Sequence, residues 1–176
     1  MSKRPPSSGP TRIRNLNRRA ALAYIRHEGP NSRSALGPAL SLSDAAVSSL
    51  VNDLLEDGLL QESEATTRDG RQGRPISLLS LNPTAAYSLG IVLRPTKDST
   101  ELGMAWADYT GHSTALPDLQ VTPHQDLDAL IKSVKTAIKR LEKVTPDADR
   151  IVGLTIAIPG VVENDTIPMA PKLPCI

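Results

Sequence analysis

The chain has 176 residues, of which 39% are hydrophobic and 2% aromatic, and its formal net charge is +1. The few aromatics argue against stacking surfaces for single-stranded nucleic acid, the single cysteine, Cys175, excludes an internal disulfide, and no apolar run reaches the roughly 20 residues of a membrane span. The N-terminus is polar and lacks the apolar segment of a signal peptide, so we expect a cytoplasmic protein. Residues 1–11 are rich in Pro, Ser and Gly and predict a disordered tail.

Two helices are predicted after this tail. The first ends at Gly29-Pro30. The second begins after Ser32, a favourable N-cap residue, and Pro38 within it predicts a short or kinked helix. The spacing of apolar residues in the first helix predicts an inward face made of Leu16, Ala20, Ala23 and Tyr24.

The third predicted helix has the clearest apolar pattern in the chain. Ser43 is its expected N-cap and Gly58 its C-terminal glycine. Two strands, 59–62 and 76–81, follow it and are joined by a polar loop at 65–75. A helix-turn-helix followed by two strands predicts a winged helix-turn-helix domain over residues 12–82. The inward residues of the third helix repeat with helical spacing: Val47, Leu50, Val51, Leu54 and Leu55.

A second domain is predicted after Asn82-Pro83, over residues 83–176. Its apolar segments predict strands at 87–93, 102–107 and 113–121, then an amphipathic helix. Residues 151–158 are continuously apolar, which is typical of a strand buried on both sides of an α/β sheet. The expected fold class is therefore α+β for the first domain and α/β for the second. The apolar face of the amphipathic helix comprises Leu127, Leu130, Ile131, Val134, Ile138 and Leu141.

Positive charge is concentrated at the N-terminal end. Residues 1–33 contain eight Lys or Arg residues and one acidic residue, Glu28. This asymmetry indicates a polyanionic partner at that end, and the alternative is a solvated basic tail. As a DNA-binding domain it would contact phosphates through Arg12, Arg14, Arg18 and Arg19. The candidate DNA-contacting residues at this end are Arg14, Arg18 and Arg33.

The third helix would be the recognition helix in the major groove. Its outward residues are small and polar, and Asn52 could read adenine through two hydrogen bonds, while Ala45 could contact a thymine methyl group. The alternative is that these residues are only solvated. The candidate DNA-contacting residues on this helix and its cap are Ser43, Ala45, Ser48, Ser49 and Asn52.

The loop between the two strands carries Arg68, Arg71 and Arg74, with Gly70 and Gly73 between them. Glycine lets a backbone approach a groove closely, and the negative potential of a narrow minor groove attracts arginine. The loop is therefore a candidate DNA-contacting wing. The alternative is a flexible, soluble hairpin loop.

These segments resemble the N-terminal half of the ROK (repressor, ORF, kinase) family repressors, which include the N-acetylglucosamine and xylose repressors. The resemblance rests on residues 19–62 and 70–91, and continues weakly through 158–162 and 170–174. It implies a winged helix joined to an actin-like, sugar-kinase lobe, which is incomplete in this chain.

The resemblance also implies where this chain departs from the kinases of the family. Their phosphate loop has the form Asp-x-Gly-x-Thr, and the matching stretch here has Val92 and Arg94 in place of Asp and Gly, with only Thr96 retained. Valine cannot organise magnesium, and a side chain at Arg94 prevents close approach of phosphates to the backbone. Lys172 stands near the position of a sugar-contacting asparagine. We therefore expect no enzymatic activity.

The sequence thus predicts a sequence-specific regulator, a repressor of carbohydrate genes, with double-stranded DNA as its partner. A homodimer is expected, and sugar sensing is doubtful because the lobe is incomplete. No catalytic residue, cofactor or metal site is predicted, since His27, His112 and His124 do not pair with Cys175 at metal-binding spacing. The alternatives are a ROK-family sugar kinase and a degraded fragment that acts only through protein association.

Overall fold

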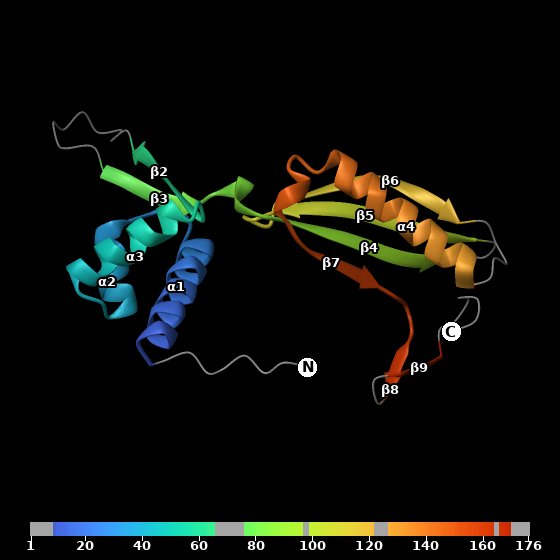
Figure 1. Ribbon diagram of the computed structural model, residues 1–176, viewed down its shortest axis with the longest axis horizontal. Coiled ribbons are helices and arrows are strands. Elements are labelled where there is room, and N and C mark those ends of the chain that lie inside the picture. Colours follow the sequence, from blue (N-terminus) through green and yellow to red (C-terminus); the bar gives the residue numbers. More distant parts are fainter. Residues whose placement is uncertain (1–8, 66–75, 97–98, 122–126, 164–165, 170–176) are drawn as a thin grey trace. The chain divides into compact units, whose positions relative to one another are not determined.

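The computed structural model describes residues 9–65, 76–96, 99–121, 127–163 and 166–169 (Figure 1). The chain divides into two compact units, Met1–Ala85 and Ala86–Ile176, shortly after the predicted boundary at Asn82-Pro83. Both units contain helices and strands, so the predicted mixed α and β content is confirmed. None of the helices in the described ranges is long and apolar enough to cross a membrane.

Unit 1 contains three helices and a small antiparallel sheet of order β1-β3-β2. Strand β2 runs three residues beyond its predicted end, and β3 has its predicted bounds. Ser63 pairs with Leu78 in the register between them. The elements are α1 (Gly9–Glu28), β1 (Asn31–Ser32), α2 (Arg33–Leu40), α3 (Asp44–Glu56), β2 (Leu60–Ala65) and β3 (Ile76–Leu81).

Helix α1 begins at Gly9, so the end of the predicted disordered tail, residues 9–11, is helical instead. Pro10 lies in the first turn, where a missing backbone N–H costs no helical hydrogen bond and the fixed φ suits the helix. Residues 1–8 lie outside the described part of the chain.

The predicted inward face of α1 is wrong. Leu16 is 53% exposed, and the buried residues of the helix are Ala21 and Ile25. Apolar side chains lie at so many positions of α1 that more than one face satisfies helical spacing. The contacts of α1 with α2, α3 and β3 decide which of these faces is buried.

Helix α2 is short and contains Pro38, as predicted. It ends at Ser41, whose left-handed φ of 55° turns the chain, and the Leu42 N–H donates to the Gly37 carbonyl at 3.0 Å. Gly37 is buried, and a Cβ there would lie 3.4 Å from the Leu42 carbonyl oxygen and 3.9 Å from Val47 Cγ2. The small residue at 37 thus lets the turn fold tightly against the helices on both sides.

Helix α3 has the predicted caps, and four of its five predicted inward residues are buried, while Leu55 is half-buried. The Ser43 hydroxyl accepts a hydrogen bond from the Ala46 N–H. Gly58 has a φ of +69°, and the Leu59 N–H donates to the Leu54 carbonyl at 2.9 Å, which closes the helix in a Schellman motif. The core of unit 1 comprises Ala21, Ile25, Leu36, Val47, Leu50, Val51, Leu54, Leu60, Leu79 and Leu81.

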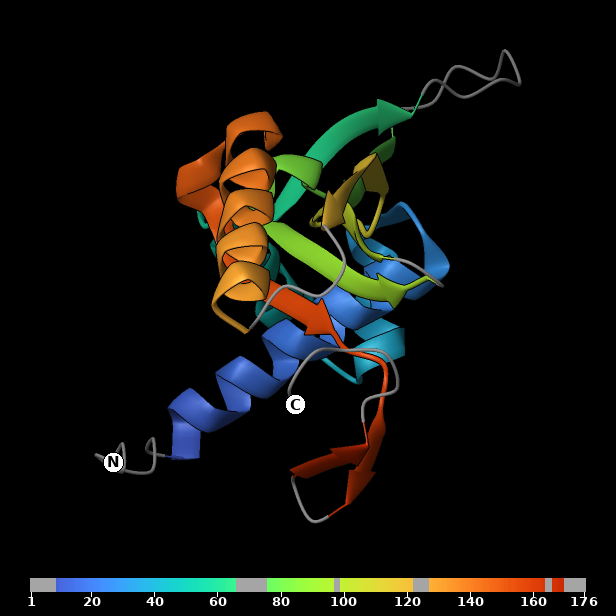
Figure 2. The same ribbon diagram turned by 90° about the vertical axis from the view of Figure 1, so that its right-hand side faces the viewer.

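Unit 2 is built on a four-stranded sheet of order β6-β5-β4-β7, in which β4 and β7 are parallel and the other neighbours antiparallel. Helix α4 lies along one face of this sheet (Figures 1 and 2). The short η1 (Pro83–Ala85) ends unit 1, directly before unit 2. The elements of unit 2 are β4 (Tyr87–Pro95), β5 (Thr100–Asp108), β6 (Ser113–Val121), α4 (Leu127–Val144), η2 (Ala148–Arg150), β7 (Ile151–Ala157), β8 (Val161–Glu163) and β9 (Thr166–Met169).

Side chains of β4 alternate between the two faces of the sheet. Leu89, Ile91 and Leu93 are buried in the core that lies between the sheet and α4. Val92 and Arg94 belong to the opposite set and line a pocket on the sheet. The remaining core residues of unit 2 are Leu102, Met104, Val121, Leu130, Ala137 and Leu141.

The prediction that residues 151–158 form a strand buried on both sides is wrong about burial. The strand exists as β7, but Val152 is 76% exposed and Leu154 41%. The reason is its place in the sheet. Within the described residues β7 pairs with β4 alone, so it is an edge strand, and α4 packs mainly on β4, β5 and β6.

Candidate nucleic-acid interface

Helix α3 presents a face of small, mostly polar side chains to solvent. Ala45, Ser48, Ser49 and Asn52 are all exposed, because the opposite side of the helix is packed in the core. Ser43, the fifth candidate on this helix, is exposed too, but its hydroxyl caps the helix at 3.4 Å from the Ala46 nitrogen. Ala45, Ser48 and Ser49 therefore remain on this face to meet a ligand, together with the part of the Asn52 amide that does not accept from Arg33.

Two predicted phosphate contacts are paired within the protein. Arg14 donates to Asp53 Oδ2 from Nη2 at 2.7 Å and from Nε at 3.1 Å, and Arg18 forms an ion pair with Asp57. Both arginines lie on α1, while Asp53 lies at the end of α3 and Asp57 is its C-cap. The pairs join these two helices and neutralise acidic groups beside the polar face of α3.

Sequence reasoning missed the two aspartates, although a signal was present. Arg14 and Arg18 are four residues apart, and so are Asp53 and Asp57. Two helices that pack side by side bring such equally spaced charges opposite each other. Arg14 and Arg18 continue along α1 into the buried Ala21 and Ile25 with helical spacing, so the two ion pairs extend the face that packs against the rest of unit 1.

Arg33, the third candidate arginine, connects three elements. Its Nη1 donates to Asn52 Oδ1 at 2.9 Å, and its Nε and Nη2 donate to the two carboxylate oxygens of Glu62 at 3.3 and 3.4 Å. A hydrogen bond from Ser77, then the hydrogen bonds from Arg33, lower the pKa of Glu62, so this carboxylate is charged at neutral pH. Arg33 thus links the start of α2 to α3 and to β2.

The candidate wing arginines, Arg68, Arg71 and Arg74, lie outside the described residues. Strands β2 and β3, which lead into this loop, are described up to the pair formed by Ala65 and Ile76. Contact of the wing with DNA stays a prediction.

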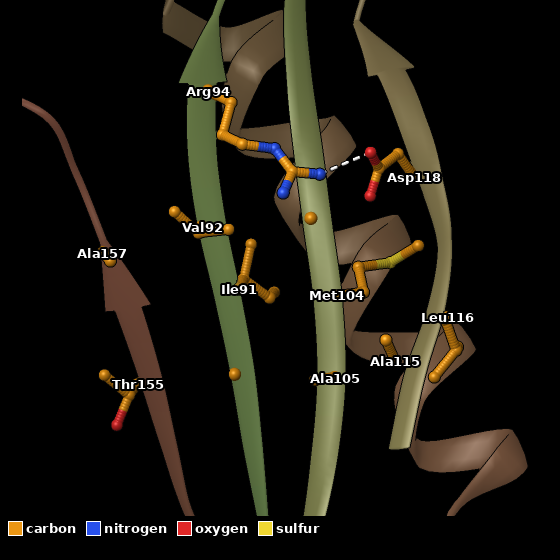
Figure 3. Close-up of a pocket in the computed structure, with 12 residues that line it drawn as sticks. Ile91, Val92, Arg94, Met104, Ala105, Ala115, Leu116, Asp118, Thr155 and Ala157 are labelled. Carbon is orange, nitrogen blue, oxygen red and sulfur yellow. Dashed lines mark hydrogen bonds and ion pairs between the residues drawn. The ribbon is translucent and has the colours of Figure 1, made fainter. Parts of the chain in front are cut away.

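In unit 2, the stretch that matches the kinase phosphate loop lies on β4 and just after it. Thr96 is part of a turn, in which its hydroxyl donates to the Ser99 carbonyl at 2.9 Å. Arg94 reaches from β4 across β5 and forms an ion pair with Asp118 on β6 (Figure 3). Lys172 lies outside the described residues.

The Arg94 side chain can cross β5 because position 103 is a glycine. A Cβ on Gly103 would lie 2.9 Å from Arg94 Nη2 and 2.7 Å from Val92 Cγ1. These residues line a pocket of about 370 Å³ on the face of the sheet that is opposite to the buried core (Figure 3). An arginine that is already paired with a carboxylate occupies the place where the kinase pattern requires a glycine.

Comparisons with known proteins show similarity to repressors over part of their length. No family model matches it. A xylose repressor of Bacillus spizizenii is 28% identical over 169 residues, and a xylose repressor of Caldicellulosiruptor bescii is 23% identical over 167 residues. These alignments cover 88% and 93% of this chain but 39% and 40% of the relatives, so the chain spans about two fifths of their length.

A solved structure shares the fold. The crystal structure of a ROK family transcriptional regulator, a homolog of the E. coli MLC protein, aligns with a TM-score of 0.58 and 23% identity over 85% of this chain and 37% of that one. The chain therefore resembles ROK-type repressors over most of its length, which confirms the resemblance predicted from the sequence.

Proposed function

We propose that this chain represses genes of sugar metabolism by binding duplex DNA, and that unit 1 is its winged helix-turn-helix domain. The observation that carries the proposal is the exposed face of small polar side chains on α3, the helix that follows the tight turn after α2. Such side chains can hydrogen-bond base edges in the major groove. The relatives are named xylose repressors, which supports genes of sugar metabolism as the class of target.

In this proposal α3 enters the major groove and the loop at 66–75 enters the adjacent minor groove. Arg68, Arg71 and Arg74 would contact the minor groove. The protein would be a cytoplasmic homodimer that binds two half-sites related by twofold symmetry. The proposal assigns it no catalysis, since Arg94 and Val92 stand where the kinase pattern has Gly and Asp.

Fluorescence anisotropy with duplexes selected from a random pool tests the proposal. Affinity should fall by about 10-fold to 1000-fold between 50 mM and 200 mM salt, as expected for several phosphate contacts. The double variant Arg71→Ala/Arg74→Ala should bind these duplexes more weakly. Lys139→Ala/Arg140→Ala, on the exposed side of α4 in unit 2, removes the same two charges, so it is the matched control and should bind normally. Equal affinity for every duplex would contradict sequence-specific binding.

A coupled assay for sugar-dependent ATP hydrolysis tests the alternative of a sugar kinase. No turnover above background is expected from this chain, and measurable turnover would overturn the assignment of a regulator without catalysis.

A further inference from the structure

Asn52 on α3 does not present a free amide to a ligand. The guanidinium of Arg33 carries only donors, so the Asn52 atom 2.9 Å from its Nη1 must be the carbonyl oxygen. The orientation of the amide is thereby fixed by chemistry. The Nδ2 amino group of this exposed side chain is then the part that can donate to a ligand.

Arg33 is in turn held from its other side. Glu62 accepts from both Nε and Nη2, so the guanidinium plane is fixed between a carboxylate on β2 and an amide on α3. About a third of each of these two charged side chains is exposed, 35% for both. An exposed ion pair of this kind contributes little stability by itself. Here the pair fixes the position of the guanidinium that orients Asn52.

A cation beside the Asn52 carbonyl changes which base suits this position. Reading adenine requires the amide oxygen to accept from the adenine amino group while Nδ2 donates to N7. With Arg33 on that oxygen, the adenine amino group would compete with a charged donor and lie close to its positive charge. Guanine offers two acceptors, N7 and O6, in the major groove, and both suit an amino group next to a guanidinium.

We propose that Arg33 is a positioning residue that holds Asn52 with its amino group outward, and that the two residues together select guanine over adenine at one operator position. The inference rests on the proposed function, since it assumes that α3 enters the major groove. It replaces the sequence-based expectation that Asn52 reads adenine, and it makes Arg33 a determinant of specificity instead of a phosphate contact.

The test uses the full chain and a random-sequence duplex pool, from which each variant selects its preferred sites. In the wild type, one position should favour guanine over adenine by about 5-fold to 100-fold, the range of a good base contact. Arg33→Met removes the donors that hold Asn52, and that preference should vanish or shift to adenine. Asn52→Ala should abolish the preference at the same position.

Two further variants separate the orienting role of Arg33 from the effect of its positive charge and from a folding defect of Arg33→Met. Arg12→Met, on α1, removes one positive charge without touching Asn52, so it should weaken all duplexes equally and keep the guanine preference. Glu62→Gln keeps the Arg33 side chain but weakens the contacts that orient its guanidinium, so it should reduce the guanine preference in part. This variant also tests the proposal if Arg33→Met folds poorly.

The outcomes distinguish the two proposals. If the wild type enriches no duplex, DNA binding itself is overturned and the inference with it. If it enriches sites but Arg33→Met keeps the guanine preference and loses affinity as Arg12→Met does, Arg33 is a phosphate contact and only the positioning role is overturned. Retention of the preference by Asn52→Ala would likewise overturn the inference alone.

Discussion

Helix α3 in unit 1 and strand β7 in unit 2 are both apolar segments that the sequence marks clearly, yet their environments differ. The large apolar residues of α3 lie on one side of the helix, and four of them are buried: Val47, Leu50, Val51 and Leu54. On β7, by contrast, three large apolar residues are exposed at 40% or more: Val152, Leu154 and Ile156. In α3, the helical repeat of apolar residues indicates which side of the helix faces inward. A continuously apolar strand has no such repeat, so its burial depends on which elements cover it.

The largest expected effect is on the free energy of unfolding, and it should differ between two leucines of unit 2. Leu102 is fully buried between the sheet and α4, whereas Leu154 on β7 is 41% exposed. Leu102→Ala should lower the free energy of unfolding by about 2–5 kcal/mol because it leaves a cavity, and Leu154→Ala by less than about 1 kcal/mol. Trp106 on β5 is the only tryptophan of the chain, so its fluorescence during urea unfolding reports unit 2 alone.

Equal losses in the two variants would contradict the exposed state of β7 and would mean that its apolar side chains are covered in solution. The comparable change in unit 1 is Leu54→Ala on α3. It should leave the unfolding transition of Trp106 fluorescence unchanged and shift the loss of helical circular dichroism to lower urea concentration.

A smaller effect is expected at the open face of the unit 2 sheet. Gly103→Ala would place a methyl group 2.7 Å from Val92 Cγ1, so it should cost about 1–3 kcal/mol of unfolding free energy. In a Val92→Ala background this clash is gone and the cost should shrink. A double-mutant cycle followed by Trp106 fluorescence measures the coupling energy between positions 92 and 103. A coupling energy near zero would contradict the close approach of these two positions.

In unit 1, the arginines of α1 should become available to DNA when their partners are removed. Asp53→Asn releases Arg14, and Asp57→Asn releases Arg18, while each loss of an exposed ion pair costs only about 0.2–1 kcal/mol of stability. Each variant should bind duplex DNA more tightly, with the slope of log affinity against log salt steeper by about one. Asp128→Asn on α4 adds the same charge change in unit 2 and is the control. Unchanged slopes would place α1 away from the phosphates.

The smallest expected effect is a pH dependence of unit 1. The pKa of Glu62 is lowered below its ordinary 4.5 by the hydrogen bonds from Ser77 and Arg33. A lowered folded pKa means that the stabilisation is complete above pH 4.5 and is lost as the pH falls through the folded value. Urea unfolding of the wild type and Glu62→Gln, followed by circular dichroism, should therefore differ at pH 7 and converge in acid. A difference that persists in strong acid would have another cause.

Helix α1 shows how far sequence patterns reached and where they stopped. Its existence and its end near Gly29 were predicted, but its buried face was not. The face was missed because its outer half is polar: Arg14 and Arg18 meet Asp53 and Asp57, and only Ala21 and Ile25 are apolar and buried. Counting apolar residues alone favours a different side of the helix, around Leu16.

The candidate site divides in the same way. Exposure of Ala45, Ser48, Ser49 and Asn52 follows from the apolar repeat of α3, because an exposed face is the complement of a buried one. The partners of Arg14, Arg18 and Arg33 could not be predicted from an apolar repeat, since these arginines contact residues that are 19 to 39 positions away along the chain.

The sequence by itself determined the order of the main helices and strands and the caps and core face of α3, because these depend on neighbours within a few residues. Only the tertiary structure decided three matters: the inward side of α1, the exposure of β7 at a sheet edge, and the placement of Arg33 between Glu62 and Asn52. Each depends on which distant segment lies opposite, and local periodicity holds no information about that.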